Sequence, residues 1–255
     1  MFTLRQYLLA LLDSRGLTRT LGEIDVCRDE QGRPCFSAGN SAAVFRIRLG
    51  GRIRSLRCYL RPMRHLKEIY GQRLLEKELY LHTSPETGVW VDTVLGDWIE
   101  GSTLHETVAQ AAALRDRESL QILVRLFDRL ALALVTDDRA HGDLKPENII
   151  VGDDGTLCPI DFDASYLPAF AGEISPELGT AAYQHPARTA ADFDERIDDY
   201  PAALISTALH ALAEDPTLWD RYGSSDGLLY TPQRIASDPA YRETLALFEK
   251  RGMAV

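Results

Sequence analysis

A short region of the chain gathers the side chains that could carry out chemistry. It contains the run His141-Gly142-Asp143-Leu144-Lys145-Pro146-Glu147-Asn148 and, eighteen positions after Asp143, the triplet Asp161-Phe162-Asp163. The region supplies a carboxylate that could act as a base, a cationic side chain, and oxygen donors that could bind a metal ion. Such a set of groups suits the transfer of a phosphoryl group from a nucleotide to a hydroxyl.

The same region resembles the catalytic loop and the metal-binding triplet of protein kinases. The lysine that follows Asp143 by two positions most resembles the Ser/Thr branch of that family. The alternative is a turn rich in Asp and Asn that matches by chance. That alternative would need six residue types in register, followed by an Asp-Phe pair at the spacing found in kinases.

The resemblance implies a role for each residue of this region. Asp143 would orient an acceptor hydroxyl and take its proton, while Lys145 would neutralise charge on the moving phosphoryl group of the bound nucleotide. Asn148 and Asp161 would be ligands of Mg²⁺, which prefers hard oxygen donors. His141 resembles the structural histidine of the family and is not expected to act as a base. The implied cofactors are ATP and Mg²⁺.

Flanking segments extend the resemblance to about residues 35–215. Residues 149–151 form an apolar run, predicted to be a strand, and Ile150 would lie beneath the adenine. The segment 179–186 resembles the end of a kinase activation segment, where the hydroxyl of Thr180 would bond the catalytic aspartate and lysine. Asp198 resembles the aspartate that anchors the backbone of the catalytic loop from the start of a helix.

The glycine-rich loop of the family is poorly represented. Kinases use three glycines there, so that backbone amides can approach phosphate. The aligned segment 37–44 keeps only Gly39, and Val44 ends the segment at the position expected to contact the nucleotide. The alternative interpretation of this segment is a plain hairpin turn.

The strand lysine of the family is also missing. Arg57 stands in its place, and arginine keeps the charge but differs from lysine in bulk and planarity. Alternatively, Arg57 is one more arginine of a basic hairpin. Glu76, nineteen residues later, is the expected helix glutamate that pairs with this cation, with Glu68 and Glu78 as competitors on the same predicted helix.

Further departures concern the second half of the chain. Gly142 replaces the arginine that receives activation-segment phosphate in the family, so the resemblance implies activity without such phosphorylation. Asp163 replaces the glycine of the metal-binding triplet and would either add a carboxylate near the metal or point outward. Ala187 replaces the glutamate of a buried ion pair. About forty residues follow Pro216, so the peptide-docking helices are expected to be abbreviated.

The remaining pattern predicts a strand-rich first part and a helical second part. Apolar residues and arginines alternate on both sides of Gly50-Gly51, which indicates a hairpin. The expected elements are a helix at 3–14, strands at 35–37, 44–49 and 53–60, a helix from Pro62 to about Leu81, two short strands within 89–99, and helices at 120–134 and 199–213. We therefore predict an α+β, two-lobed protein-kinase-like fold, with an N-lobe at 1–99 and a shortened helical C-lobe at 100–255.

Charge and composition limit the classes of function. The 255 residues carry a net charge of −10, which argues against nonspecific binding to nucleic acid or to acidic membranes. Residues 31–67 nevertheless contain nine basic residues and no Asp or Glu, which predicts either a solvated sheet face or a patch for an anionic ligand. Four scattered cysteines and an N-terminal apolar run too short to span a bilayer predict a cytoplasmic protein.

Three functions fit these observations. The first is transfer of phosphate from Mg-ATP to a Ser or Thr hydroxyl of a protein, favoured by Lys145 and Thr180. The second is a pseudokinase that acts as a nucleotide-binding scaffold or regulatory module for a partner protein, favoured by the altered nucleotide-binding half. The third is a small-molecule kinase, because His-Gly-Asp also occurs in kinase-like antibiotic and sugar phosphotransferases.

Overall fold

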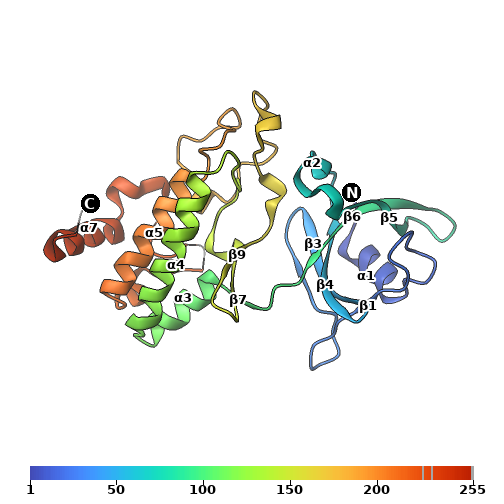
Figure 1. Cartoon of the computed structure of the whole chain (residues 1–255), viewed down its shortest axis with the longest axis horizontal. Coiled ribbons are helices and arrows are strands. Elements are labelled where there is room, and N and C mark those ends of the chain that lie inside the picture. Colours follow the sequence, from blue (N-terminus) through green and yellow to red (C-terminus); the bar gives the residue numbers. More distant parts are fainter. Residues whose placement is uncertain (226, 231, 254–255) are drawn as a thin grey trace. The chain divides into compact units, whose positions relative to one another are not determined.

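The computed structural model describes residues 1–225, 227–230 and 232–253. The chain forms two compact units, Met1–Trp98 and Ile99–Val255. The first contains an antiparallel sheet and the second is mainly helical (Figure 1). This is the predicted α+β, two-lobed kinase-like architecture. Within the described ranges, no helix combines the length and the apolar character needed to cross a membrane.

The first unit is built around a sheet with the strand order β1-β3-β4-β6-β5, and β2 also pairs with β3. The strands are β1 (Asp25–Val26), β2 (Phe36–Ala38), β3 (Ala42–Leu49), β4 (Arg52–Tyr59), β5 (Leu74–His82) and β6 (Gly88–Asp97). Gly50 and Gly51 join β3 to β4 with φ angles of 54° and 79°, which glycine adopts readily. The predicted hairpin is therefore confirmed.

One face of this sheet forms the core of the first unit. Side chains alternate along β3 and β4, so that Phe45, Ile47 and Leu56 are fully buried on this face. Helix α1 (Leu4–Leu12) packs Tyr7 and Leu11 into the same cluster. The helix begins as predicted at the N-cap Thr3, which forms a capping box with Gln6.

The opposite face of the sheet carries some of the basic residues of the hairpin, among them Arg46 and Arg57. Val44 pairs with Arg57 and Arg46 pairs with Ser55 across β3 and β4, so the four side chains share one face. Both arginines are half-buried. The guanidinium of Arg46 lies 5.7 Å from the centre of the Trp98 ring, within the range of a cation–π contact.

The predicted helix from Pro62 to about Leu81 is wrong. Only α2 (Leu66–Tyr70) and the 3₁₀ turn η1 (Gly71–Arg73) are helical, and β5 begins at Leu74. The helix ends because Gly71 has φ 53° and ψ −124°, far from helical values. Beyond it, Leu79 and Leu81 are buried at strand spacing. Burial of these two leucines on the core face outweighs the helix propensity of the segment.

The segment 89–99 also differs from its prediction. It was expected to contain two short strands, but β6 is continuous from Gly88 to Asp97 and pairs with both β4 and β5. The irregularity lies in the partner strand instead. The register of β5 shifts between Leu75 and Leu79, where Lys77 has a φ of 51°.

The two glutamates of β5 have opposite environments. Glu78 is 1% exposed, and its carboxylate accepts hydrogen bonds from the backbone N–H groups of Arg19, Thr20 and Leu21 at 2.9–3.1 Å. The hydroxyl of Thr20 donates a further bond at 2.6 Å. Glu76 is exposed and forms an ion pair with Lys67 at 3.6 Å. Glu78 therefore fixes the loop at residues 19–21, whereas Glu76 makes only a surface ion pair.

The second unit combines five helices within the described residues with a small antiparallel sheet, ordered β7-β8-β9. The strands are β7 (Gly101–Thr103), β8 (Ile149–Gly152) and β9 (Leu157–Pro159). The helices are α3 (Leu104–Ala113), α4 (Arg117–Val135), α5 (Asp199–Glu214), α6 (Leu218–Tyr222) and α7 (Pro239–Arg251). The 3₁₀ turns are η2 (Pro146–Asn148), η3 (Phe162–Ala164), η4 (Pro168–Phe170), η5 (Ala181–Tyr183) and η6 (Pro232–Ser237). The two long helices predicted at 120–134 and 199–213 and the strand at 149–151 are confirmed.

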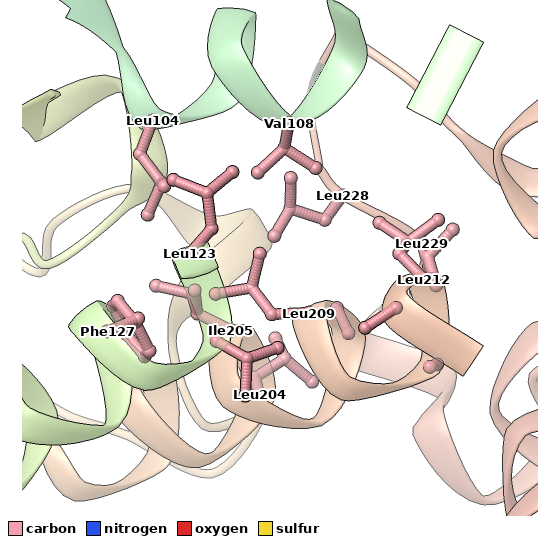
Figure 2. Packing of buried hydrophobic residues seen from close by; sticks show 14 of the residues in the cluster. Leu104, Val108, Leu123, Phe127, Leu204, Ile205, Leu209, Leu212, Leu228 and Leu229 are labelled. Atoms are coloured by element: carbon pink, nitrogen blue, oxygen red, sulfur yellow. The ribbon is translucent and has the colours of Figure 1, made fainter. Parts of the chain in front are cut away.

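The core of the second unit lies between α3, α4 and α5 (Figure 2). Val108 of α3 and Phe127 of α4 are fully buried, as are Ile205 and Leu209 of α5. The four-residue spacing of Ile205 and Leu209 places both on one face of α5. This core fixes the ends of α4 and α5, between which the loop 141–148 must run.

We predict that Glu78→Gln lowers the free energy of unfolding by about 2–3 kcal/mol, because the amide group cannot accept every hydrogen bond that the carboxylate accepts. Glu76→Gln is the matched control on the same strand, and we expect a change within about 0.5 kcal/mol there. Urea denaturation followed by tryptophan fluorescence measures both. Equal effects of the two substitutions would contradict the buried role of Glu78.

Candidate active site

The loop 141–148 is anchored by a single buried carboxylate. Asp198, the N-cap of α5, is 1% exposed and accepts hydrogen bonds from the backbone N–H groups of His141 and Gly142, the latter at 3.0 Å. Burial raises the pKa of Asp198, while His141, the two amides and Arg188 favour its charged form. The predicted anchoring role of Asp198 is confirmed.

His141 is held through both nitrogens of its ring. Nε2 is hydrogen-bonded to the carbonyl of Ile160 at 2.7 Å, and Nδ1 accepts a bond from the backbone N–H of Asp143 at 3.4 Å. The ring also packs against Phe162 with centroids 4.9 Å apart. Because both nitrogens are engaged, His141 supports the loop and is not placed to remove a proton from a substrate.

Asp143 lies at the centre of a set of short polar contacts. Its Oδ1 accepts a hydrogen bond from the backbone N–H of Thr180 at 2.5 Å, and its Oδ2 lies 3.2 Å from Nζ of Lys145. Nζ of Lys145 also donates to the hydroxyl of Thr180 at 2.7 Å. The predicted bond between Thr180 and the lysine is confirmed, but Thr180 reaches the aspartate through its backbone rather than its hydroxyl.

These contacts leave the two charged groups accessible. The side chains of Asp143 and Lys145 are 17% and 22% exposed, and their ion pair fixes one carboxylate oxygen beside one ammonium group. A hydroxyl that approaches Asp143 therefore meets an acceptor for its proton and, next to it, a cation that can stabilise negative charge. This is the arrangement that phosphoryl transfer requires.

Asn148 and Asp161 lie at the same end of the β8–β9 hairpin. The backbone N–H of Ile160, next to Asp161, donates to the carbonyl of Asn148 at 2.8 Å. The Nδ2 group of Asn148 donates to Asp143, at 2.9 Å to the backbone oxygen and 3.2 Å to Oδ2. The amide oxygen of Asn148 thus remains for another partner. Asp161 itself has a left-handed backbone (φ 68°) and begins η3.

The donor chemistry of this pair suits Mg²⁺. An amide oxygen and a carboxylate are hard ligands, and Mg²⁺ usually keeps several waters in addition to protein oxygens. Among the described residues, no group of three or more His, Cys, Asp or Glu side chains could hold a metal ion. Asn148 and Asp161 could supply two oxygen ligands to such an ion.

Of the two alternatives for Asp163, the outward one is wrong because the residue is buried.

The structure explains why Gly142 replaces an arginine. Gly142 has a φ of 81°, and a Cβ atom there would lie 2.0 Å from the backbone oxygen of Ala164. No side chain can be accommodated at that position. The loop instead receives a cation from elsewhere, because Nη1 of Arg188 donates to the carbonyl of Gly142 at 3.3 Å and to Oε1 of Gln184.

Arg188 is the residue of this region that the sequence analysis missed. Burial lowers the pKa of its guanidinium, and the nearby carboxylates of Asp198 and Asp143 oppose this effect. Its Nε and Nη2 atoms are buried without a hydrogen-bond acceptor in the part of the chain that the structure describes. The only signal in the sequence was a lone arginine after the segment 179–186, which no spacing rule connects with the loop.

The other predicted nucleotide-binding residues have distinct local settings. Ile150 is half-buried in β8 and pairs with Thr103 and Cys158. In the first unit, Gly39 occupies the turn between β2 and β3, where its N–H donates to the carbonyl of Ala42 at 2.9 Å. Val44 and Arg57 are direct partners across β3 and β4.

The prediction that Glu76 lies on a helix is wrong. The residue was expected on a helix, where it would pair with Arg57. It lies on β5 and pairs with Lys67, because the helix that would have carried it ends at Gly71. Glu68 does lie on α2, whereas Glu78 is occupied by the backbone of residues 19–21.

We predict that Gly142→Ala lowers the free energy of unfolding by at least about 3 kcal/mol, because a new Cβ atom would overlap a backbone oxygen that cannot move away. Gly155→Ala is the control, since Gly155 has a φ of 78° but no heavy atom within 4 Å of a new Cβ. Gly155→Ala should cost only about 1 kcal/mol. Thermal unfolding compares the two variants, and similar losses would refute the close approach.

We predict that Arg188→Met lowers the free energy of unfolding by about 2–3 kcal/mol at neutral pH, because it removes the guanidinium that favours the charged form of the buried carboxylate of Asp198. Arg188→Lys should lose less. Without the guanidinium, the pKa of Asp198 in the folded chain rises further. A carboxyl with a raised pKa lowers the stability of the fold as the pH rises and the carboxyl loses its proton. The deficit should thus shrink on acidification. Urea denaturation at several pH values measures it, and a pH-independent deficit would contradict the electrostatic role.

Comparison with known proteins places this geometry in context. No protein-family model matches the chain. The chain is 28% identical to CBL-interacting protein kinase 17 from Oryza sativa over 172 residues, which are 64% of this chain and 35% of that protein. It is 34% identical to the serine/threonine-protein kinase PknL from Mycobacterium tuberculosis over 113 residues, 42% of this chain and 27% of PknL.

A third relative is the serine/threonine-protein kinase chk1 from Schizosaccharomyces pombe, 25% identical over 160 residues, which are 61% of this chain and 31% of chk1. The chain thus spans about a third of the length of the curated relatives that it matches. All three relatives are protein kinases. Over the matched residues the chain is thus similar to protein kinases at modest identity, which supports a divergent relationship with them.

Proposed function

We propose that the chain transfers the terminal phosphate of ATP, in the presence of Mg²⁺, to a Ser or Thr hydroxyl of a protein substrate. The observation that carries this proposal is the set of contacts among Asp143, Lys145 and Thr180. The ammonium group of Lys145 lies 3.2 Å from the carboxylate of Asp143 and donates to the hydroxyl of Thr180 at 2.7 Å. The backbone N–H of Thr180 donates to the same carboxylate at 2.5 Å, and the two charged side chains are partly accessible. The kinase relatives support phosphoryl transfer at the level of the family.

Each of these groups has a defined task in the proposed reaction. Asp143 orients the substrate hydroxyl and receives its proton as the new bond to phosphorus forms. Lys145 stabilises the negative charge of the transferring group, and Thr180 holds the ammonium group beside the carboxylate. The proton of the hydroxyl ends on Asp143. The bond between the terminal phosphorus of ATP and its bridging oxygen breaks, the phosphoryl group joins the substrate oxygen, and ADP leaves.

The proposed metal ligands are the amide oxygen of Asn148 and the carboxylate of Asp161. When bound, Mg²⁺ would neutralise charge on the nucleotide phosphates. Asn148 contributes a second effect of its own, since its Nδ2 group holds Asp143 at two atoms. The resemblance also assigns nucleotide contacts to Ile150 and to Gly39, Val44 and Arg57, and these assignments remain proposals.

The contacts of Arg188 bear on regulation of the proposed activity. In the family, the residue that Gly142 replaces binds a phosphate on the activation segment. Here Arg188 belongs to the region that follows the segment 179–186 and already bonds the carbonyl of Gly142. We infer that this connection holds the segment against the loop without phosphorylation.

A second candidate function is a nucleotide-binding scaffold without catalytic activity. The observation that favours it is the replacement of the expected glutamate-bearing helix by β5, which leaves Glu76 paired with Lys67. The single glycine of the segment 37–44 and Arg57 in place of lysine point the same way. Both candidates predict nucleotide binding, and they differ in whether phosphate moves.

We predict that Mg-ATP raises the melting temperature of the wild-type chain and that Asp161→Ala abolishes the metal-dependent part of this rise. Asp143→Ala should keep the rise but lower the transfer of radiolabelled phosphate to a generic protein substrate by at least about 100-fold. Asp153→Ala, at an exposed carboxylate on the β8–β9 turn, is the control for both measurements.

The outcomes separate the candidates. Label transfer that depends on Asp143 supports the enzyme. Stabilisation by Mg-ATP without any label transfer supports the scaffold. If neither Mg-ATP nor ATP alone shifts the melting temperature, both candidates are wrong.

A further inference from the structure

The second half of α4 carries apolar side chains that the fold does not bury. Its first half buries four residues: Leu120, Leu123, Val124 and Phe127. In the following run, 130–135, three residues pack partly buried against the core, whereas Leu132, Ala133 and Val135 are exposed. Leu132 is 64% exposed and Val135 is 41% exposed. A helix end that simply faced water would carry polar residues on this side.

This apolar run lines a groove on the second unit. Ala131, Leu132 and Val135 of α4 face Ala202 and Ala203 of α5 across a hollow of about 810 Å³. The two helices lie side by side (Figure 1). We call this hollow the α4–α5 groove. Its volume is in the range of sites that bind a ligand or a short peptide segment.

The rim of the α4–α5 groove is acidic. Asp137 and Asp138 follow the end of α4, and Glu195 and Asp199 flank the start of α5. Arg196 is the one basic residue among the described residues that line it. Arg139, just outside the groove, forms an ion pair with Asp137 at 3.0 Å and lowers the pKa of that carboxyl to about 2. The remaining carboxylates of the rim, for which the described residues provide no ion pair, are those of Asp138, Glu195 and Asp199.

Two acids at the end of α4 oppose the charge of the helix terminus. The C-terminal end of a helix carries partial negative charge and favours cations. The last turn of α4 contains no basic residue, and Asp137 and Asp138 follow it directly. The end of α4 therefore departs from two general tendencies, because its exposed face is apolar and its C-terminus is followed by acids instead of basic residues. Departures of this kind at one place are typical of binding surfaces.

We propose that the α4–α5 groove binds a segment of a partner protein that combines aliphatic side chains with lysine or arginine. The aliphatic side chains would cover Leu132 and Val135, and the basic ones would meet the carboxylates of the rim. None of the residues assigned to catalysis or metal binding lines the groove. The proposal therefore goes beyond phosphoryl transfer and holds for the scaffold as well.

The test uses a synthetic fluorescent peptide of about twelve residues that alternates pairs of leucine and lysine, with a leucine–glutamate peptide as the charge control. Fluorescence anisotropy should show that the basic peptide binds to the full chain and that the acidic control peptide does not. Binding should weaken several-fold as the salt concentration rises from about 50 mM to about 500 mM.

Substitutions locate the peptide. Leu132→Ser should weaken binding at least about fivefold, because it removes exposed apolar contact area. Leu114→Ser is its matched control, since Leu114 is 69% exposed and outside the groove, and binding should not change. Glu195→Lys should weaken binding at least about fivefold, whereas Asp153→Lys should not. Leu132→Ser should leave phosphate transfer unchanged, which separates this proposal from the proposed activity.

Three results would overturn the proposal. Equal affinities for Leu132→Ser and Leu114→Ser would show that the peptide binds the acidic surface nonspecifically. A wild-type dimer that Leu132→Ser converts to a monomer in sedimentation velocity would assign the groove to a second copy of the chain. Absence of any binding of the basic peptide to the wild-type chain would show that the groove does not accept a segment of this chemistry.

Discussion

The second unit depends on the bonds between one carboxylate and two backbone amides. Asp198 starts α5 inside the core, and its buried side chain holds the N–H groups of His141 and Gly142. Burial of a carboxylate is costly unless donors surround it. This cost favours one position of the loop, the one in which its N–H groups donate to the carboxylate of Asp198. Asp198 therefore couples the helical core to the loop 141–148, and the fully buried side chain of Leu144 joins the same core.

The other polar contacts of the site follow from this anchor. With the backbone of His141 and Gly142 fixed, Asp143 is directed toward Thr180, and Asn148 bonds back to Asp143 from η2. The close approach of Gly142 to Ala164 brings η3, and with it Asp161, to the same loop. The site is thus built from segments far apart in the sequence that converge on three consecutive residues of the loop.

Sequence reasoning succeeded where a local pattern determined the structure. The contacts of Asp198 and the bond between Lys145 and Thr180 follow from motifs, and the turn at Gly50-Gly51 follows from backbone geometry. It failed where distant packing outweighed local preference. Residues 74–82 favour a helix by composition, but pairing with β6 and burial of Leu79 determine a strand. The role of Arg188 was invisible because its partners are contributed only by the folded chain.

The two units depart from the kinase pattern to different degrees, and the difference has a physical basis. The loop 141–148 works through atoms that must meet within about 3 Å, so few residue types can replace its members. Contacts to phosphate by backbone N–H groups, such as those expected near Gly39, tolerate many side chains because the side chain takes no part. Arg57 likewise keeps a positive charge without the lysine geometry. If the proposed reaction takes place, divergence in the first unit would therefore weaken recognition of the nucleotide sooner than it would remove the proposed chemistry of Asp143.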